Sequence, residues 1–218
     1  MKLEEKLSQF MGATNESDIQ KVFKELAPAF LYGGYIQVRK DYQIYIRTVE
    51  FYFHSEKADG IHDPIVYHRN KRDLDGKLIM EIPYFTPMTL HSHDSGFDIT
   101  FECKDEGCEY RASALIRAYE VKDEIGNYWI WNTKTGMFEK SHEYGYNTQS
   151  TYLKKLLNGF PLGISNEVQW VDYPTEQDIE IEVKARKNVF NSESDFVYMK
   201  IEGERCKREW SFTRIEQV

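Results

Sequence analysis

Apolar positions near the N-terminus recur at helical spacing, and further along the chain the period becomes two. The helical spacing predicts one helix over residues 3–11 and a second that begins after a cap at Asn15 or Ser17. Alternation of apolar and polar positions then predicts strands over 35–40 and 42–53. The chain is therefore expected to open with two helices and to continue into a sheet.

The remainder of the chain is rich in strand patterns and contains one long polar interruption. Residues 54–88 carry many His, Asp, Gly and Pro residues, which predicts a long loop of the kind that usually has a function. A short helix is expected from Ser150. Further strands are expected at 97–102, 110–120, 128–131, 168–172, 179–186, 196–202 and 209–215. Because strands do not alternate with helices, the pattern favours an antiparallel α+β fold in one domain, residues 1–218.

Two charged residues interrupt apolar strand patterns. Alternation along 42–53 places Glu50 on the same face as Ile44 and Ile46. A carboxylate on an apolar face is costly to bury unless it is paired or hydrogen-bonded. Arg117 interrupts the apolar run 112–119 in the same way. The two residues are either parts of structural ion pairs or a general base and its partner across a pocket.

Polar clusters in and after the loop supply further candidates. Arg69, Asn70, Lys71 and Arg72 are consecutive and form either a binding surface or a solvated loop. His91 and His93 are two positions apart, so on a strand they would point the same way and could hold a metal ion with a nearby carboxylate. His-x-His also occurs by chance, and the metal site is kept as an alternative.

Composition narrows the classes of protein that remain. The chain has 218 residues and a formal net charge of −8, which opposes general nucleic-acid binding but allows a local basic face. No apolar run is long enough to span a membrane, and the first residues lack a signal-peptide core, so a cytoplasmic location is expected. Cys103 and Cys108 flank a turn and could pair across a hairpin, but two reduced thiols are expected in a cytoplasmic protein.

The same clusters, in this order, resemble motifs of the alkyladenine (3-methyladenine) DNA glycosylase family. The resemblance covers roughly residues 25–120, weakens over 149–218, and leaves 121–148 as an expected insertion. The matching segments are Ala29-Phe-Leu-Tyr-Gly33, Ile46-Arg-Thr-Val-Glu-Phe-Tyr52, Asp59-Gly-Ile-His62, Arg69-Asn70, Thr89-Leu-His-Ser-His93 and Leu115-Ile-Arg-Ala-Tyr-Glu120. His91 and His93 stand where the family has two pocket tyrosines.

The resemblance implies a fold, a chemistry and a set of residue roles. The fold would be a strongly curved antiparallel sheet, similar to the barrel of formyltransferase C-terminal domains. A damaged purine would be flipped out of DNA, and Glu50, supported by Arg117, would activate a water molecule to release it. No metal or organic cofactor is implied. The base pocket would contain Tyr52, His62, His91 and His93, and the DNA contacts would come from Arg69, Asn70, Lys71 and Arg72.

Two other functions stay open at this point. The chain could keep the fold and bind nucleic acid or a nucleobase without catalysis. It could also be a small metal-dependent enzyme that uses His91 and His93. The catalytic function requires Glu50 and Arg117 to lie within hydrogen-bonding distance, directly or through one water molecule, and we expect this contact. Side chains on opposite faces of the sheet would exclude it.

Overall fold

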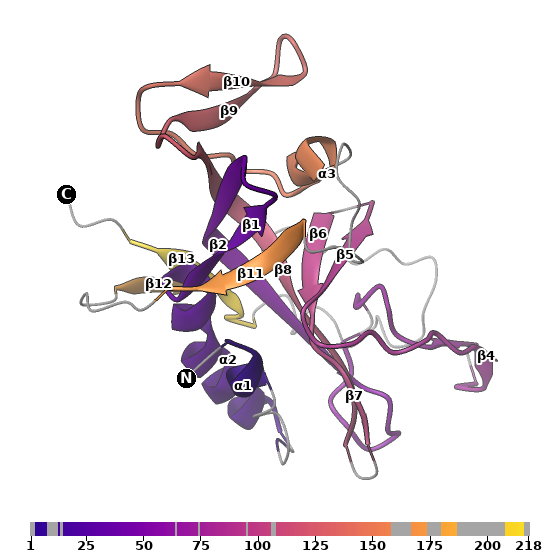
Figure 1. The fold of residues 1–218 in the computed structure, drawn as a ribbon. Coiled ribbons are helices and arrows are strands. Elements are labelled where there is room, and N and C mark those ends of the chain that lie inside the picture. The colour runs from indigo at the N-terminus through magenta and orange to yellow at the C-terminus, as the bar shows by residue number, and fades with distance from the viewer. Residues whose placement is uncertain are drawn as a thin grey trace.

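Two long antiparallel strands, β2 (Tyr42–Ser55) and β8 (Cys108–Asp123), form the centre of the computed structural model and pair along most of their length. The other strands extend this pair on both edges, so that the sheet curls like part of a barrel (Figure 1). The structure describes residues 3–7, 13, 15–63, 65–73, 75–94, 96–105, 108–157, 167–173, 180–186 and 208–215.

The partners of the two central strands change along their length. Beyond β2 lie β1 (Gly34–Val38) with β11 (Val168–Asp172), and then β13 (Ser211–Arg214) with β12 (Ile181–Lys184). Beyond β8 lie the strands β7 (Cys103–Asp105), β6 (Gly96–Thr100) with β5 (Thr89–His93), and β9 (Tyr128–Asn132) with β10 (Met137–Ser141). A separate two-stranded sheet, β3 (Lys71–Arg72) and β4 (Leu78–Met80), projects from the loop region.

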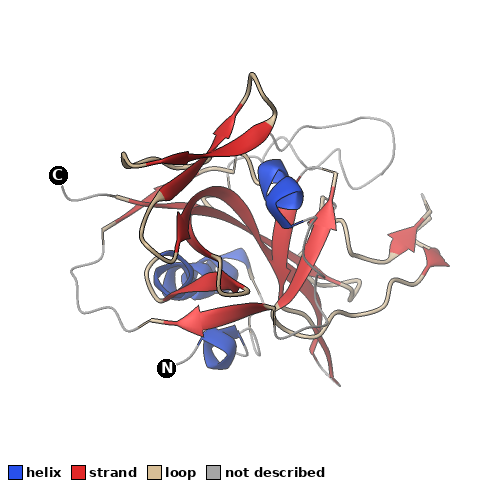
Figure 2. Ribbon diagram, turned by 45° about the horizontal axis from the view of Figure 1, so that its top comes forward, coloured by secondary structure: helices blue, strands red, loops and turns tan. Residues whose placement is uncertain are grey.

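Helix α2 (Glu16–Leu31) covers the apolar face of the sheet, and the short helix α1 (Leu3–Leu7) packs beside it (Figure 2). The Asn15 side chain accepts a hydrogen bond from the Asp18 amide at 3.0 Å and so caps α2. Phe23 stacks on Phe51 of β2 at 4.6 Å between ring centres. A third helix, α3 (Thr151–Leu157), lies against β6.

Most of the expected elements are present, and the α+β class with antiparallel strands is confirmed. Asn15, not Ser17, caps the second helix. The long loop contains the small β3–β4 sheet, and the segment 121–148 contains the β9–β10 hairpin. The strand expected at 196–202 lies outside the described residues. Cys103 and Cys108 are free thiols, as expected. No described helix combines the length and apolarity needed to cross a membrane.

Candidate active site

The alternation of side chains along β2 slips by one residue in the middle of the strand. The pairing with β8 is regular up to Ile46 and again from Val49, but irregular between them. Ile44 and Ile46 face the apolar core before the slip, whereas Val49 and Phe51 face it afterwards. Glu50 therefore lies on the opposite, polar face, and the expectation that it shares a face with Ile44 and Ile46 is wrong, because an irregular pairing re-aims the residues that follow it.

Glu50 is buried, at 1% exposure, and Arg117 and Tyr52 hold its carboxylate. Arg117 of β8 donates from Nε to Glu50 Oε2 at 2.7 Å, and the Tyr52 hydroxyl donates to the same oxygen at 3.1 Å. The expected contact between Glu50 and Arg117 is thereby confirmed. The Arg117 side chain keeps 24% exposure, so the pair spans the boundary between the buried sheet face and open space.

Burial and charge act in opposite directions on this group. Burial lowers the pKa of Arg117, whereas the interactions of Arg117 with Tyr52 and Glu50 raise it. The raising effects are larger in sum, so the pKa lies above its ordinary value. Burial, and then the neighbouring Glu50 carboxylate, raise the pKa of the Tyr52 hydroxyl. Tyr52 therefore stays a neutral hydrogen-bond donor, and Arg117 stays a cation.

Glu50 and Arg117 border an open cavity of about 550 Å³. Its floor consists of polar residues paired across three strands. One row contains Glu50, Ser211 and Lys184, and the next contains Thr48, Thr213 and Glu182. The segment from Tyr146 to Thr151, which leads into α3, forms the remaining wall together with Arg117 and Ala118.

The hydroxyl residues of the cavity floor could not be identified from the sequence, because each hydroxyl is ordinary in its own strand. Ser211 and Thr213 reach the site only through the pairing of β13 with β2, which joins segments more than 150 residues apart. Lys184 enters one strand further away. No local pattern specifies that register.

Tyr52, expected in a base pocket, is buried at 8% exposure and does not border the cavity. The Arg186 guanidinium lies over its ring, 4.6 Å from the ring centre, and donates to Asp63 Oδ2 at 2.6 Å. That face of the ring is therefore occupied by a cation. In this arrangement the contact that Tyr52 makes with the site is its hydroxyl bond to Glu50.

His62, Arg69 and Arg72 lie at a second pocket of about 280 Å³, which His54 and Glu56 also help to line. Arg69 is only 4% exposed, and Asn70 is hydrogen-bonded into the loop through its side chain. Burial, followed by the charge of Arg69, lowers the pKa of Lys71. These residues therefore do not line the Glu50 cavity, and DNA contact by any of the four stays a prediction.

His91 and His93 lie on β5 and form an aromatic cluster. Their ring centres are 5.9 Å apart, and His93 stacks on Tyr67 at 4.3 Å. His93 Nε2 lies 3.3 Å from Asp98 Oδ2. Burial and the neighbouring His68 lower the pKa of His91. In the part of the chain that the structure describes, no three His, Cys, Asp or Glu side chains form a possible metal site.

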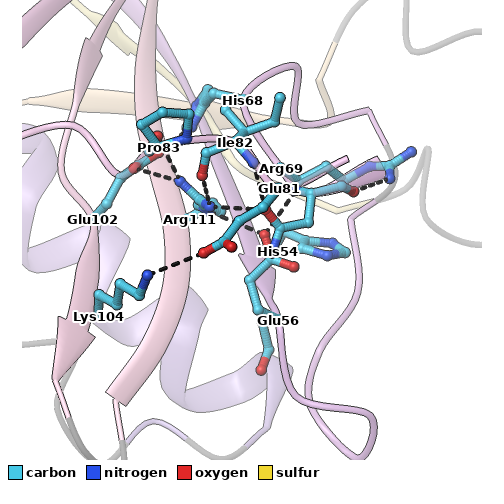
Figure 3. A network of polar contacts seen from close by, with 12 residues as sticks. His54, Glu56, His68, Arg69, Glu81, Ile82, Pro83, Glu102, Lys104 and Arg111 are labelled. Atoms are coloured by element: carbon cyan, nitrogen blue, oxygen red, sulfur yellow. Dashed lines mark hydrogen bonds and ion pairs between the residues drawn. The ribbon is translucent and has the colours of Figure 1, made fainter. Parts of the chain in front are cut away.

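A buried network around Arg111, at the other end of β8, was not recognised in the sequence (Figure 3). Arg111 donates to Glu56 Oε1 and Glu102 Oε2, each at 3.0 Å, and to the Ile82 carbonyl at 2.6 Å. The Tyr84 ring lies 3.4 Å from its guanidinium carbon. The signal that singled out Arg117, an arginine in an apolar strand, applies equally to Arg111.

Comparison with known proteins found no match to this chain among family models, curated proteins or solved structures.

Proposed function

We propose that the protein hydrolyses the N-glycosidic bond of a purine, with Glu50 as general base. The observation that carries the proposal is a buried glutamate held by Arg117 and Tyr52 at the border of an open polar cavity. A desolvated carboxylate with a fixed orientation suits proton abstraction from water. The curled antiparallel sheet is compatible with the alkyladenine glycosylase fold and with the formyltransferase-like barrel.

The chemistry assigned to the site is a displacement at the anomeric carbon. A water molecule beside Glu50 forms a bond to that carbon, and its proton passes to the carboxylate. The bond between carbon and nitrogen breaks, and its electron pair leaves with the purine, which takes a proton from solvent. Arg117 fixes the carboxylate so that it meets the water in one orientation. In the proposal the purine is alkylated or deaminated, as in DNA base excision.

Glu50→Gln tests this proposal, because it keeps the shape of the side chain and removes its basicity. We expect single-turnover release of hypoxanthine or alkyladenine to fall by about 10²–10⁴-fold. Arg117 stays partly solvated, so the free energy of unfolding should fall by only about 1–3 kcal/mol. Urea unfolding and release assays on wild type and variant measure both quantities.

Glu120→Gln provides a matched control. Glu120 is also a buried glutamate paired with an arginine, Arg47, at 2.6 Å, but it does not border the cavity. This variant should lose stability while keeping its release rate. Equal rate losses in both variants, or a wild type that releases no purine, would remove the enzymatic proposal.

The second candidate function is nucleobase or nucleic-acid binding without catalysis. This function is favoured because Glu50 already has a structural role: its Oε2 accepts hydrogen bonds from both Arg117 and Tyr52. Under this reading Glu50→Gln would lower stability, and wild type and variant would bind the same ligand without converting it.

A further inference from the structure

Three consecutive large apolar side chains of β4 are exposed to solvent. Leu78 is 45% exposed, Ile79 66% and Met80 55%. They lie on the small β3–β4 sheet, which projects from the body of the protein (Figure 1). Single exposed apolar residues are ordinary on protein surfaces, whereas a contiguous group of them marks an interaction surface. β4 is therefore a candidate contact surface for a partner.

One edge of β4 is free among the described residues. β4 pairs with β3 on one side, and no described strand pairs with its other side. Met80 lies opposite Lys71, and Leu78 lies opposite Arg72. Ile79 therefore has no opposite residue on β3. An edge strand presents N–H and C=O groups that can pair with a strand of another chain, and apolar side chains along it favour that pairing.

The sequence around Ile79 is complementary to itself when two copies run antiparallel. Lys77 precedes β4, and Glu81 follows it. If Ile79 of one copy lies opposite Ile79 of the other, Leu78 of each copy lies opposite Met80 of the other. Lys77 of each copy then lies opposite Glu81 of the other. Apolar residues thus meet apolar residues at the centre, and opposite charges meet at both ends, which is the favourable arrangement for cross-strand pairs.

Glu81 can make this contact although it already has a neighbour. Its Oε1 lies 3.0 Å from Lys104 Nζ, and the two side chains are 58% and 62% exposed. An ion pair that is so exposed to solvent contributes little to stability. A carboxylate also has a second oxygen that can accept from the Lys77 ammonium group of another copy.

We infer that β4 pairs with β4 of a second copy of this chain around a two-fold axis. The same surface is used on both copies, so the contact closes on itself. The joined sheet would have the order β3–β4–β4–β3, and its outer strands carry Lys71 and Arg72. Cations on an edge strand oppose the addition of further strands, so association stops at two copies.

This contact is small, and the dimer is therefore weak and reversible. Three residues of each copy pair, and the irregular pairing at Ile79 bends the strand as a bulge does. Stable dimers bury larger surfaces. The inference is independent of the chemistry proposed for Glu50, because it concerns a different part of the molecule.

The test is sedimentation velocity of the whole wild-type chain from low micromolar to millimolar concentration. We expect the weight-average mass to rise from that of one chain toward that of two. Ile79→Lys places two like charges opposite each other at the two-fold axis and should leave the protein monomeric throughout. Its melting temperature should not change, because Ile79 is exposed. Ile125→Lys is the matched control, since Ile125 lies in the turn between β8 and β9 and is 79% exposed; this variant should associate as wild type does.

Exchange of the flanking charges tests the register. Lys77→Glu places a glutamate opposite Glu81 at both ends of the contact and should weaken association about fivefold. Glu81→Lys should have a similar effect. The double variant Lys77→Glu with Glu81→Lys restores opposite charges at both ends, and we expect it to associate as wild type does.

Several outcomes would overturn the inference. They are a wild type that stays monomeric at every concentration, a mass that rises beyond two copies, equal losses in Ile79→Lys and Ile125→Lys, and a double variant that does not recover. Binding of a monomeric wild type to phosphatidylcholine vesicles, lost in Ile79→Lys, would assign β4 to a lipid surface instead.

Discussion

The Tyr52 hydroxyl makes a contact with Glu50 that a phenylalanine would lose. It donates to Glu50 Oε2, while the Tyr52 ring lies under Arg186. Tyr52→Phe keeps the ring and the cation above it and removes the hydroxyl, with its hydrogen bond to the charged acceptor Glu50. We expect the free energy of unfolding to fall by about 1.5–3 kcal/mol, and the rate of purine release to fall as well, because Glu50 loses a hydrogen bond that orients its carboxylate.

Urea unfolding and single-turnover rates measure the effect of Tyr52→Phe. Tyr110→Phe is the rate control, since Tyr110 is also buried on this sheet but stacks on Phe53 away from the cavity. An unchanged rate in Tyr52→Phe would mean that Tyr52 supports the fold without orienting Glu50.

His91 gives the protein a pH dependence whose sign follows from burial. Its pKa is lowered from 6.5 in the folded protein, with burial as the main cause and His68 second. As the pH falls, the unfolded chain takes up this proton first, so the folded state loses stability below about pH 6.5 until the folded pKa is reached. His91→Gln removes that loss. Urea unfolding at each pH measures the free energy of unfolding of both proteins. Taking their difference at pH 8 as the reference, we expect that difference to change between pH 7 and 5. Parallel curves for wild type and variant would contradict the prediction.

The site could be predicted from the sequence only in part. The ordered motifs identified Glu50 and Arg117 as neighbours, since a charge in an apolar strand is visible without a structure. The face of Glu50 was assigned wrongly because the slip between Ile46 and Val49 has no sequence signature. Ser211 was not found, because strand register across the sheet is a tertiary property.

At the scale of elements, Asn147 is one of the residues that attach the β9–β10 hairpin to the body. Asn147 is buried, and its side chain donates to the Trp129 carbonyl at 3.0 Å and accepts from the Trp131 amide at 2.7 Å. Its backbone pairs with Tyr119 of β8. The expected insertion is thus hydrogen-bonded to the sheet, and the segment that follows it forms a wall of the cavity.

Asn147→Ala should lower the free energy of unfolding by about 2–4 kcal/mol, because two hydrogen bonds are lost and the Trp131 amide is left without a partner. Hydrogen exchange should increase across residues 128–141. Thr133→Ala at the exposed hairpin turn is the control and should change neither quantity. Unchanged exchange in the hairpin would show that the stacking of Trp131 on Tyr152 holds it instead.

The boundaries of the elements followed from the sequence where local chemistry sets them. The Asn15 cap at the start of α2 is an example. The β3–β4 sheet was missed because its strands are two and three residues long and lie within a segment of loop composition. Short strands depend on their partners more than on their own sequence.

On the scale of the whole molecule, the polar face of β2 and β8 has two ends with different properties. Near Arg117 the face borders an open cavity and its charges are partly exposed. Near Arg111 the face is fully buried, and its charges tie the loop region to the sheet. Asp98, which contacts Ser113 at 3.2 Å, lies between these ends. The Arg117 end therefore has the features of a ligand-binding site, and the Arg111 end has those of a structural network.

Arg111→Met tests this division. The change leaves Glu56 and Glu102 buried without their cation, so the free energy of unfolding should fall by about 3–5 kcal/mol. Because Arg111 does not border the cavity, purine release per folded molecule should stay close to that of wild type. Arg111→Lys, which keeps the charge but loses the forked guanidinium, should be intermediate in stability and provides a milder variant if the methionine protein does not fold. Urea unfolding, together with release rates normalised to the folded fraction, separates the two ends. If a folded Arg111→Met variant lost as much rate as Glu50→Gln, the buried network and the cavity would act as one unit.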